Sequence, residues 1–226
     1  MDARGTWDAL ASAETEEVVG DPARGREELD SLFARLGADP HGGACVELGC
    51  GPGRMTGALA ERFDRVLALD VSPAMLERAR RAVTAENVEF AAVSAGSLHG
   101  VPDGIADVAI CYLVLQHLPS RAAVGSTLGE LARVLVPGGQ AFVQLPVLDP
   151  GARPRLWRLA RSLAVPLLAR LSPSPRSARA FRGFRLTAAE LDAALSAARL
   201  RLIARDEGPD APYRYSRDVF LRLERL

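Results

Sequence analysis

Short apolar runs alternate with stretches of helical periodicity through the middle of the chain. Apolar residues repeat at helical spacing from Met55 to Phe63 and from Pro73 to Val83, and Ser72 and Ser120 stand where helix caps are expected. Alternation of this kind is typical of βαβ units, in which parallel strands form one sheet. The runs that predict strands lie at 44–48, 66–70, 88–93, 107–112 and 140–146.

The two ends of the chain carry different patterns. Near the N-terminus the spacing of apolar residues predicts a pair of helices, the first from Thr6 to Val19. Near the C-terminus, Thr187 opens a helix with the T-x-x-E pattern of a capping box. Two further strands are predicted at 200–205 and 217–225, and the short connection between them makes the pair antiparallel.

These patterns predict an α/β fold built as one domain. We expect a Rossmann-like doubly wound sheet of seven strands with the last antiparallel. A chain of 226 residues fits one large domain. The expected regions are an N-terminal helical cap at 1–43, a core of alternating strands and helices at 44–149, a basic helical insertion after strand five at 150–186, and a C-terminal helix and β-hairpin at 187–226.

The insertion at 150–186 is strongly basic. It contains nine arginines, from Arg153 to Arg185, and no acidic residue, although the whole chain has a formal net charge of zero. Three interpretations stay open. The arginines can form a solvated helical face, they can form a lid that recruits an anionic substrate, or they can lie on an anionic membrane surface. Pro166 shortens the apolar face that the last interpretation needs.

The composition limits the partners of the chain. Apolar residues make up 48% of the sequence, the net charge is zero, and no apolar run reaches the length of a membrane span. With a polar, acidic N-terminus, we expect a cytoplasmic protein without a signal peptide, a membrane span or a nucleic-acid partner. The expected partner is a small-molecule substrate, and the oligomeric state, monomer or homodimer, stays open.

Two residue types exclude several mechanisms. The chain has no lysine, which excludes a Schiff-base lysine and a P-loop lysine. Cys45, Cys50 and Cys111 form no C-x-x-C pair and have no histidine cluster nearby. We therefore interpret them as buried thiols and expect no metal site.

A glycine-rich turn follows the first predicted strand. Gly49, Gly51 and Gly53 have the spacing GxGxG and lead into helical sequence. Glycines at such a turn allow positive φ, and the N–H groups at the start of the next helix can face a ligand. The second strand ends at Asp70, about 20 residues later, where nucleotide-binding folds place an acid that binds ribose. The pattern indicates a nucleotide-containing ligand.

Four motifs in this order resemble the class I S-adenosylmethionine-dependent methyltransferases, in particular the group that acts on small molecules. The resemblance runs from about Ala44 to Pro146, and the terminal hairpin extends it to Leu226. The motifs read ELGCGPG at 47–53, VLALDVSPAM at 66–75, DVAICYLVLQHLP at 107–119 and LARVLVPGG at 131–139.

The resemblance implies S-adenosylmethionine as the cofactor. It places Glu47 near the amino group of the methionyl end and Asp70 on the ribose hydroxyls. Ser94 stands where the family usually has an acid that contacts adenine, so a hydroxyl or the backbone would take that hydrogen bond. The cofactor-binding residues implied are Glu47, Gly49, Cys50, Gly51, Gly53, Asp70, Val71, Met75, Ser94, Ala95, Gly96, Cys111 and Gln116.

Methyl transfer requires alignment of the nucleophile more than acid–base chemistry. A general base is needed only if the nucleophile carries a proton. His117 follows strand four, at the edge where open parallel sheets bind ligands, and is the candidate catalytic base, with packing of its loop as the alternative. Trp7 either anchors the helical cap or covers a ligand. The candidate substrate residues are Trp7, Tyr112, Gln116, His117, Trp157 and Tyr213.

We therefore expect transfer of a methyl group from S-adenosylmethionine to an oxygen, nitrogen or carbon nucleophile of a small molecule, with anionic or natural-product acceptors in view. One alternative is a catalytically silent binding or regulatory protein with the same fold. Another is a nicotinamide-dependent oxidoreductase, which would show GxGxxG where this chain has GxGxG.

Overall fold

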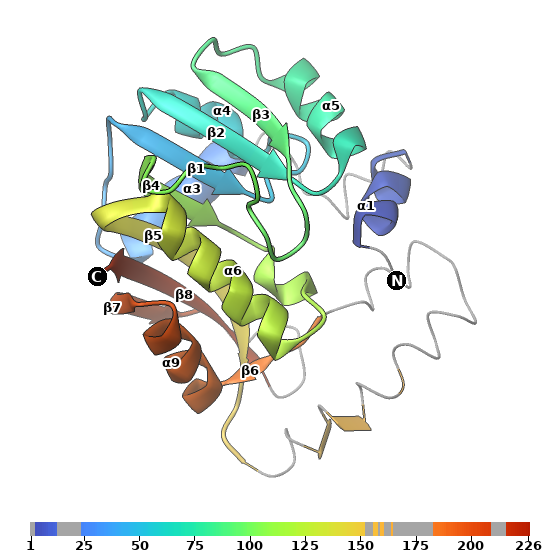
Figure 1. Cartoon of the computed structure of the whole chain (residues 1–226), viewed down its shortest axis with the longest axis vertical. Helices are drawn as coiled ribbons and strands as arrows, with labels where there is room; N and C mark the ends of the chain where they lie inside the picture. Colours follow the sequence, from blue (N-terminus) through green and yellow to red (C-terminus); the bar gives the residue numbers. More distant parts are fainter. Residues whose placement is uncertain are drawn as a thin grey trace.

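A single mixed β-sheet runs through the computed structural model, which describes residues 3–12, 24–151, 156–157, 159–160, 164, 183–208 and 216–226. Its strands are β1 (Ala44–Leu48), β2 (Arg65–Asp70), β3 (Val88–Ala92), β4 (Ala106–Cys111), β5 (Leu135–Leu148), β6 (Leu186–Thr187), β7 (Leu200–Glu207) and β8 (Ser216–Arg225). Their order in space is β3-β2-β1-β4-β5-β8-β7, with β6 paired to β5 (Figure 1).

The direction of the strands agrees with the sequence prediction. Strands β1 to β5 pair in parallel, and β8 is antiparallel to both β5 and β7. The chain passes from β1 outward to β3 and then returns to place β4 on the other side of β1. This reversal is the topological switch point of a doubly wound sheet, and ligands bind at the carboxyl ends of the strands beside it.

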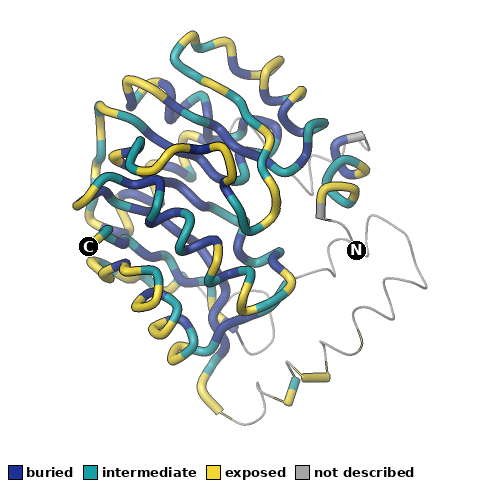
Figure 2. The backbone as a smooth tube through the Cα atoms, viewed as in Figure 1, coloured by how far each residue is buried: buried dark blue, intermediate teal, exposed yellow. Residues whose placement is uncertain are grey.

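Helices cover both faces of the sheet, so the central strands are largely buried (Figure 2). Helices α6 and α9 pack on one face, where Leu131 and Leu191 join Val143 of β5. On the other face, Phe33 of α3 contacts Phe142 of β5 with ring centroids 4.9 Å apart. The helices are α1 (Ala3–Ser12), α3 (Gly25–Arg35), α4 (Thr56–Ala60), α5 (Pro73–Ala82), α6 (Arg121–Val134) and α9 (Ala188–Ala197), with a 3-10 turn, η2 (Leu115–His117), after β4.

The predicted helix caps form as the sequence indicates. The Ser72 hydroxyl accepts a hydrogen bond from Met75 N at the start of α5, and the Ser120 hydroxyl accepts one from Ala123 N at the start of α6. Thr187 and Glu190 make a reciprocal capping box at α9. These caps satisfy backbone N–H groups that have no partner within their helix.

Strand β5 differs from the prediction because it begins at Leu135 rather than at Gln140. Leu135 pairs with Ala106 and Gln140 with Val108, so residues 136–139 bulge out opposite Asp107 alone. Pro137 has no N–H for the ladder and Gly138 has a φ of +77°, which together explain why these residues form a bulge within a longer strand. The short strand β6 is a second addition to the predicted sheet.

Two predicted helical segments fall partly outside the described residues. The described part of helix α1 is Ala3–Ser12, and the rest of the helix predicted to Val19 lies outside the described residues. Most of the basic insertion at 150–186 also lies outside them, so its boundaries and its role stay predictions. None of the helices among the described residues is long and apolar enough to cross a membrane.

Strand β7 forms one outer edge of the sheet. Leu202 and Ile203 on this strand are exposed, and the pairing with β8 shifts register between Leu202 and Ala204. Arg201 and Arg205 on the same strand pair with Glu224 and Glu207. The edge is therefore bulged and charged.

Candidate active site

The glycine turn after β1 lies at the switch point, between the ends of β2 and β4. Gly49, Gly51 and Gly53 all have positive φ, at +77°, +54° and +90°. The N–H groups of Gly49 and Cys50 donate to the carbonyl of Leu69 at 2.7 and 3.0 Å, which ties the turn to β2.

The three glycines are required for different reasons. A Cβ at Gly49 would lie 2.2 Å from Cγ2 of Val114, so this glycine allows the β4 loop to approach the turn. A Cβ at Gly53 would meet Val83 and Ala79. At Gly51 nothing lies within 4 Å of such a Cβ. The backbone at Gly51 therefore borders open space, as a ligand cradle must.

Asp70 presents its carboxylate beside that space. Oδ2 accepts from Gly51 N at 2.9 Å, and Oδ1 accepts from Ser72 N at 2.8 Å. Burial raises the pKa of Asp70, and the backbone hydrogen bonds oppose that rise. A carboxylate has about four lone-pair positions, so Asp70 retains acceptors for two ribose hydroxyls and fits the predicted role.

Glu47 is a buried carboxyl group on β1, 5% exposed. Burial is the largest effect on its pKa, which rises to about 7, while a hydrogen bond from the Thr56 hydroxyl at 2.6 Å opposes the rise. Glu47 lines a small cavity together with Gly49, Cys50 and Tyr112. A buried acid beside the glycine turn is suited to receive an ammonium group.

Arg54 lines the same cavity and was not among the predicted site residues. Its guanidinium pairs with Glu28 of α3 at 3.1 Å and lies 5.6 Å from the centre of the Tyr112 ring. The position of Arg54 directly after the glycine triplet was the only signal in the sequence, and it does not indicate that Glu28 and Tyr112 are its partners. Arg54 therefore connects α3, the glycine turn and the end of β4.

Two predicted cofactor residues are cysteines with buried thiols. Burial raises the pKa of Cys111, at the end of β4, to about 12. Burial also raises the pKa of Cys50 in the glycine turn. Both thiols therefore stay protonated at neutral pH, which favours packing over nucleophilic chemistry. In the described residues no group of three metal-binding side chains comes together.

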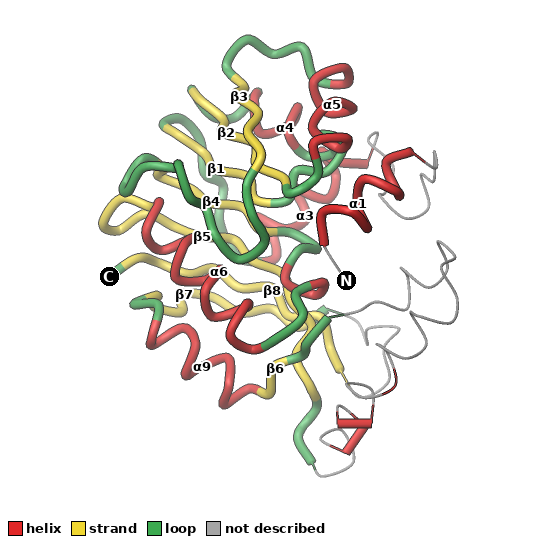
Figure 3. Tube along the Cα trace, turned by 45° about the vertical axis from the view of Figure 1, so that its right-hand side comes forward, coloured by secondary structure: helices red, strands yellow, loops and turns green. Residues whose placement is uncertain are grey.

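Helix α1 crosses the carboxyl edge of the sheet and lies beside α5 (Figure 3). Asp8 accepts a hydrogen bond from the Ser72 hydroxyl at 2.5 Å and receives Ala74 N at 3.4 Å. One residue earlier, Trp7 contacts His117 edge to face, with ring centroids 4.9 Å apart. The helix thus links the end of β2 to the loop after β4.

The structure brings His117 and Gln116 to this edge on η2. Nε2 of Gln116 lies 3.2 Å from Nε2 of His117 and donates to the carbonyl of Leu113 at 3.3 Å. The backbone carbonyl of Gln116 accepts a hydrogen bond from Gly183 N at 2.5 Å. The catalytic role of His117 stays a prediction, but its position beside the switch point agrees with it.

Five further residues predicted to bind the cofactor lie around the ends of β2 and β3. Ser94 and Ala95 are exposed, and Val93 N donates to the carbonyl of Asp70 at 3.0 Å, so this loop adjoins Asp70. Gly96 has a φ of +77°. Val71 is half-buried, whereas Met75 is 1% exposed and packs against Leu10 and Ala11 of α1. Their contacts with a cofactor stay predictions.

The aromatic substrate candidates do not form one group. Tyr112 lies at the end of β4 and stacks with Phe220, with ring centroids 6.5 Å apart. Burial raises the pKa of Tyr112. Trp157 is half-buried with the guanidinium of Arg185 5.0 Å from its ring centre. Tyr213 lies outside the described residues.

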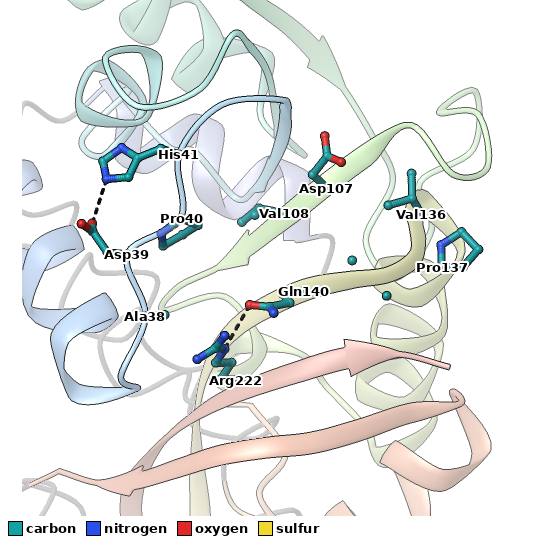
Figure 4. A pocket seen from close by; sticks show the side chains of 12 residues that line it. Ala38, Asp39, Pro40, His41, Asp107, Val108, Val136, Pro137, Gln140 and Arg222 are labelled. Atoms are coloured by element: carbon teal, nitrogen blue, oxygen red, sulfur yellow. Dashed lines mark hydrogen bonds and ion pairs between the residues drawn. The ribbon is translucent and has the colours of Figure 1, made fainter.

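A larger cavity, of about 500 Å³, opens at the opposite edge of the sheet (Figure 4). Its lining includes Asp39, His41, Asp107, Gln140 and Arg222, and none of the predicted site residues. It lies at the amino ends of β4 and β5, away from the switch point. Parallel sheets bind their ligands at the carboxyl edge, so the candidate site is the edge with Gly51 and Asp70, and this larger cavity lies outside it.

Comparison with known proteins places this site in a family context. Residues 46–143 match the family model described as a methyltransferase domain. The chain is 40% identical over 157 residues to a trans-aconitate 2-methyltransferase of Methylobacterium nodulans, covering 68% of this chain and 55% of that protein. It is 30% identical over 126 residues to a ubiquinone biosynthesis O-methyltransferase of Xanthomonas oryzae, covering 55% of this chain and 51% of that protein. The chain thus spans about half the length of these relatives.

Solved structures share the fold. The N-methyltransferase NodS of Bradyrhizobium japonicum, in complex with S-adenosyl-L-homocysteine, matches with a TM-score of 0.68 at 16% identity, covering 100% of this chain and 99% of that one. The magnesium protoporphyrin IX methyltransferase of Synechocystis, with the same bound molecule, matches with a TM-score of 0.66 at 18% identity, covering 99% and 98%. These matches confirm the predicted sheet with its antiparallel strand.

The raised pKa of Glu47 predicts a pH dependence of stability. A pKa that rises from 4.5 to about 7 on folding means that the folded state binds the proton more tightly. Stability from this group is therefore complete below pH 4.5 and is lost as the pH rises to about 7, by about 3 kcal/mol. We expect Glu47→Gln to remove this loss in urea unfolding measured without cofactor from pH 4.5 to 7.5.

The matched control is Glu89→Gln, which changes an exposed glutamate on β3. This variant should keep the pH dependence of the wild type. If Glu47→Gln and the wild type lose stability in parallel across this pH range, the Glu47 carboxyl does not carry the effect.

Proposed function

We propose that the chain carries a class I S-adenosylmethionine-dependent methyltransferase domain and that it transfers a methyl group from S-adenosylmethionine to a small-molecule acceptor. The observation that carries the proposal is the open space at Gly51, bordered by the Asp70 carboxylate, on the turn that follows the strand of the buried Glu47. The experiment that tests it is a methyl-transfer assay with a panel of acceptors.

We assign the cofactor contacts from these residues. Asp70 would accept hydrogen bonds from the ribose hydroxyls, because its carboxylate is already fixed by two backbone N–H groups. Glu47 would pair with the ammonium group of the methionyl end, which favours the ionised form of a carboxyl whose pKa burial has raised. Gly51 would allow the ligand to approach the backbone.

The bound cofactor would supply an activated methyl group on a sulfonium. The chain would supply alignment and exclusion of water. Helix α1 serves the second task, because Asp8 and Trp7 hold it across the carboxyl edge between α5 and η2. His117 would accept a proton from an acceptor with a hydroxyl nucleophile. An ionised carboxylate acceptor would need no base.

Small organic acids are the first acceptor class to test, and phenols are the second. The relatives named for trans-aconitate and for ubiquinone biosynthesis favour these two classes. The nine arginines of the insertion favour an anionic acceptor on charge alone. Binding of S-adenosyl-L-homocysteine without turnover of any acceptor would instead favour a catalytically silent protein.

Asp70→Asn tests the cofactor site directly. We expect the affinity for S-adenosyl-L-homocysteine to fall by about 1–3 kcal/mol, because a buried hydrogen-bond partner of the ribose is lost. Isothermal titration calorimetry measures this, and circular dichroism checks that the variant folds. The matched control is Asp107→Asn, whose carboxylate also accepts a backbone N–H, from Ala44, but at the opposite edge. Equal affinity in wild type and Asp70→Asn would show that ribose binds elsewhere.

His117→Ala tests the catalytic assignment. For an acceptor with a hydroxyl nucleophile, we expect kcat to fall by about 10²-fold, with loss of one limb of the pH–rate profile. His99→Ala, which changes an exposed histidine in the loop after β3, serves as the control. A pH–rate profile that stays unaltered in His117→Ala would assign this side chain to packing against Trp7.

A further inference from the structure

Leu113 leaves the sheet in a conformation that leucine rarely adopts. Its φ is +60°, and Arg199 is the other residue with positive φ among the described residues that are not glycine. A left-handed backbone is strained for a residue with a Cβ, because the Cβ comes too close to the following carbonyl oxygen. Such strain persists where the surroundings hold it, and it concentrates at functional sites. Leu113 begins the loop that carries Gln116 and His117.

The side chain of Gln144 holds this position. Its Oε1 accepts the backbone N–H of Leu113 at 3.2 Å, and its Nε2 donates to Oδ1 of Asp218 on β8 at 2.9 Å. Gln144 is 1% exposed. A buried amide is costly unless both of its ends are paired, and here both are.

The register of the sheet explains why the side chain of Gln144, and not a backbone carbonyl, accepts the hydrogen bond from Leu113 N. The ladder between β4 and β5 ends at the pair Cys111 and Val143. Beyond this pair the N–H of Leu113 bonds to the side chain of Gln144 instead of to a backbone carbonyl. This hydrogen bond turns the chain away from β5, because the side chain reaches out of the plane in which the ladder would continue.

The rest of the loop follows from that turn. Val114 comes next and packs into the space that Gly49 leaves open. His117 N donates to the carbonyl of Val114 at 2.9 Å, which closes η2. The imidazole of His117 then lies against Trp7 of α1. The position of this imidazole depends on how the chain departs at Leu113.

We propose that Gln144 is a positioning residue for His117. Its amide holds Leu113 in the left-handed conformation and so sets the loop from Leu113 to His117, while Asp218 fixes the orientation of the amide. The effect on turnover rests on the proposed function, because it requires that His117 serves the acceptor. The effect on the position of the imidazole requires no catalysis.

Nuclear magnetic resonance of the histidine side chains tests this placement. The chain has three histidines, so His117 can be assigned by substitution of His41 and His99. Because the Trp7 ring lies 4.9 Å away, we expect it to shift the ring-proton resonances of His117 from those of a free imidazole. We expect Gln144→Leu to move these resonances towards the free values and to leave those of His99 in place. Unchanged His117 resonances in a folded Gln144→Leu protein would overturn the proposal.

Gln140→Leu is a matched control on the same strand. Oε1 of Gln140 accepts from Nε of Arg222 on β8 at 3.0 Å, which copies the pairing of Gln144 with β8 at the opposite edge of the sheet (Figure 4). This variant should keep the His117 resonances of the wild type. A shift of these resonances as large as in Gln144→Leu would overturn the specific role of Gln144.

Exchange of the two polar partners provides a second test if Gln144→Leu does not fold. Gln144→Glu alone places a carboxylate beside Asp218 and should displace His117. The double variant Gln144→Glu with Asp218→Asn keeps an acceptor for Leu113 N and restores the hydrogen bond between positions 144 and 218 with donor and acceptor exchanged, so it should restore the wild-type resonances. A double variant that stays displaced would overturn the proposal.

Measurement of kcat tests whether the position of His117 affects catalysis. In Gln144→Leu we expect kcat to fall by about 10- to 10²-fold through misplacement of the loop, with unchanged affinity for S-adenosyl-L-homocysteine. A kcat equal to that of the wild type would overturn the catalytic role. Lack of turnover in the wild-type chain would count against the proposed function alone, because the resonances report on Gln144 without catalysis.

Discussion

The close approach of Val114 to Gly49 is the constraint on which the site depends. A side chain at position 49 would collide with Val114, so the β4 loop can lie against the glycine turn only while that position has no Cβ. This contact joins the two strands on either side of the switch point at their carboxyl ends. It brings the cofactor turn and the loop with His117 into one structure. The remaining contacts of the edge, from Arg54, Trp7 and Gln144, add to this arrangement.

The buried acids give the site its electrostatic character. Burial is the largest cause of the raised pKa of Glu47, and the negative charge of Asp70 raises this pKa further. Asp70 is affected by burial and, to a lesser extent, by the charge of Asp8 on α1. Three carboxyl groups thus surround the carboxyl edge of β1 and β2. Because like charges oppose one another in a buried place, this edge favours a ligand that brings positive charge.

Most of the fold could be predicted from the sequence, because local patterns determine it. Apolar runs gave the strands within a few residues, and Ser72, Ser120 and Thr187 cap the helices that they precede. The predicted start of β5, at Gln140, was wrong because a proline and two glycines indicate a turn whether or not the strand continues on both sides. The candidate cofactor residues gather at the edge where the resemblance placed them, and their contacts stay predictions.

Arg54, Asp8 and Gln144 could not be found in this way. Asp8 meets Ser72 across 64 residues of sequence, and Gln144 meets Asp218 across 74. Each of these contacts depends on the register of strands or on the docking of a helix, which no local pattern encodes.

The exposed edge of the sheet at β7 affects how the molecule can associate with other molecules. Its bulge and its two arginines interrupt the row of backbone groups that another sheet would need for pairing. Growth of the sheet by addition of a strand from a second molecule is therefore disfavoured at β7, which protects a chain with an exposed Leu202 and Ile203 from fibrous aggregation.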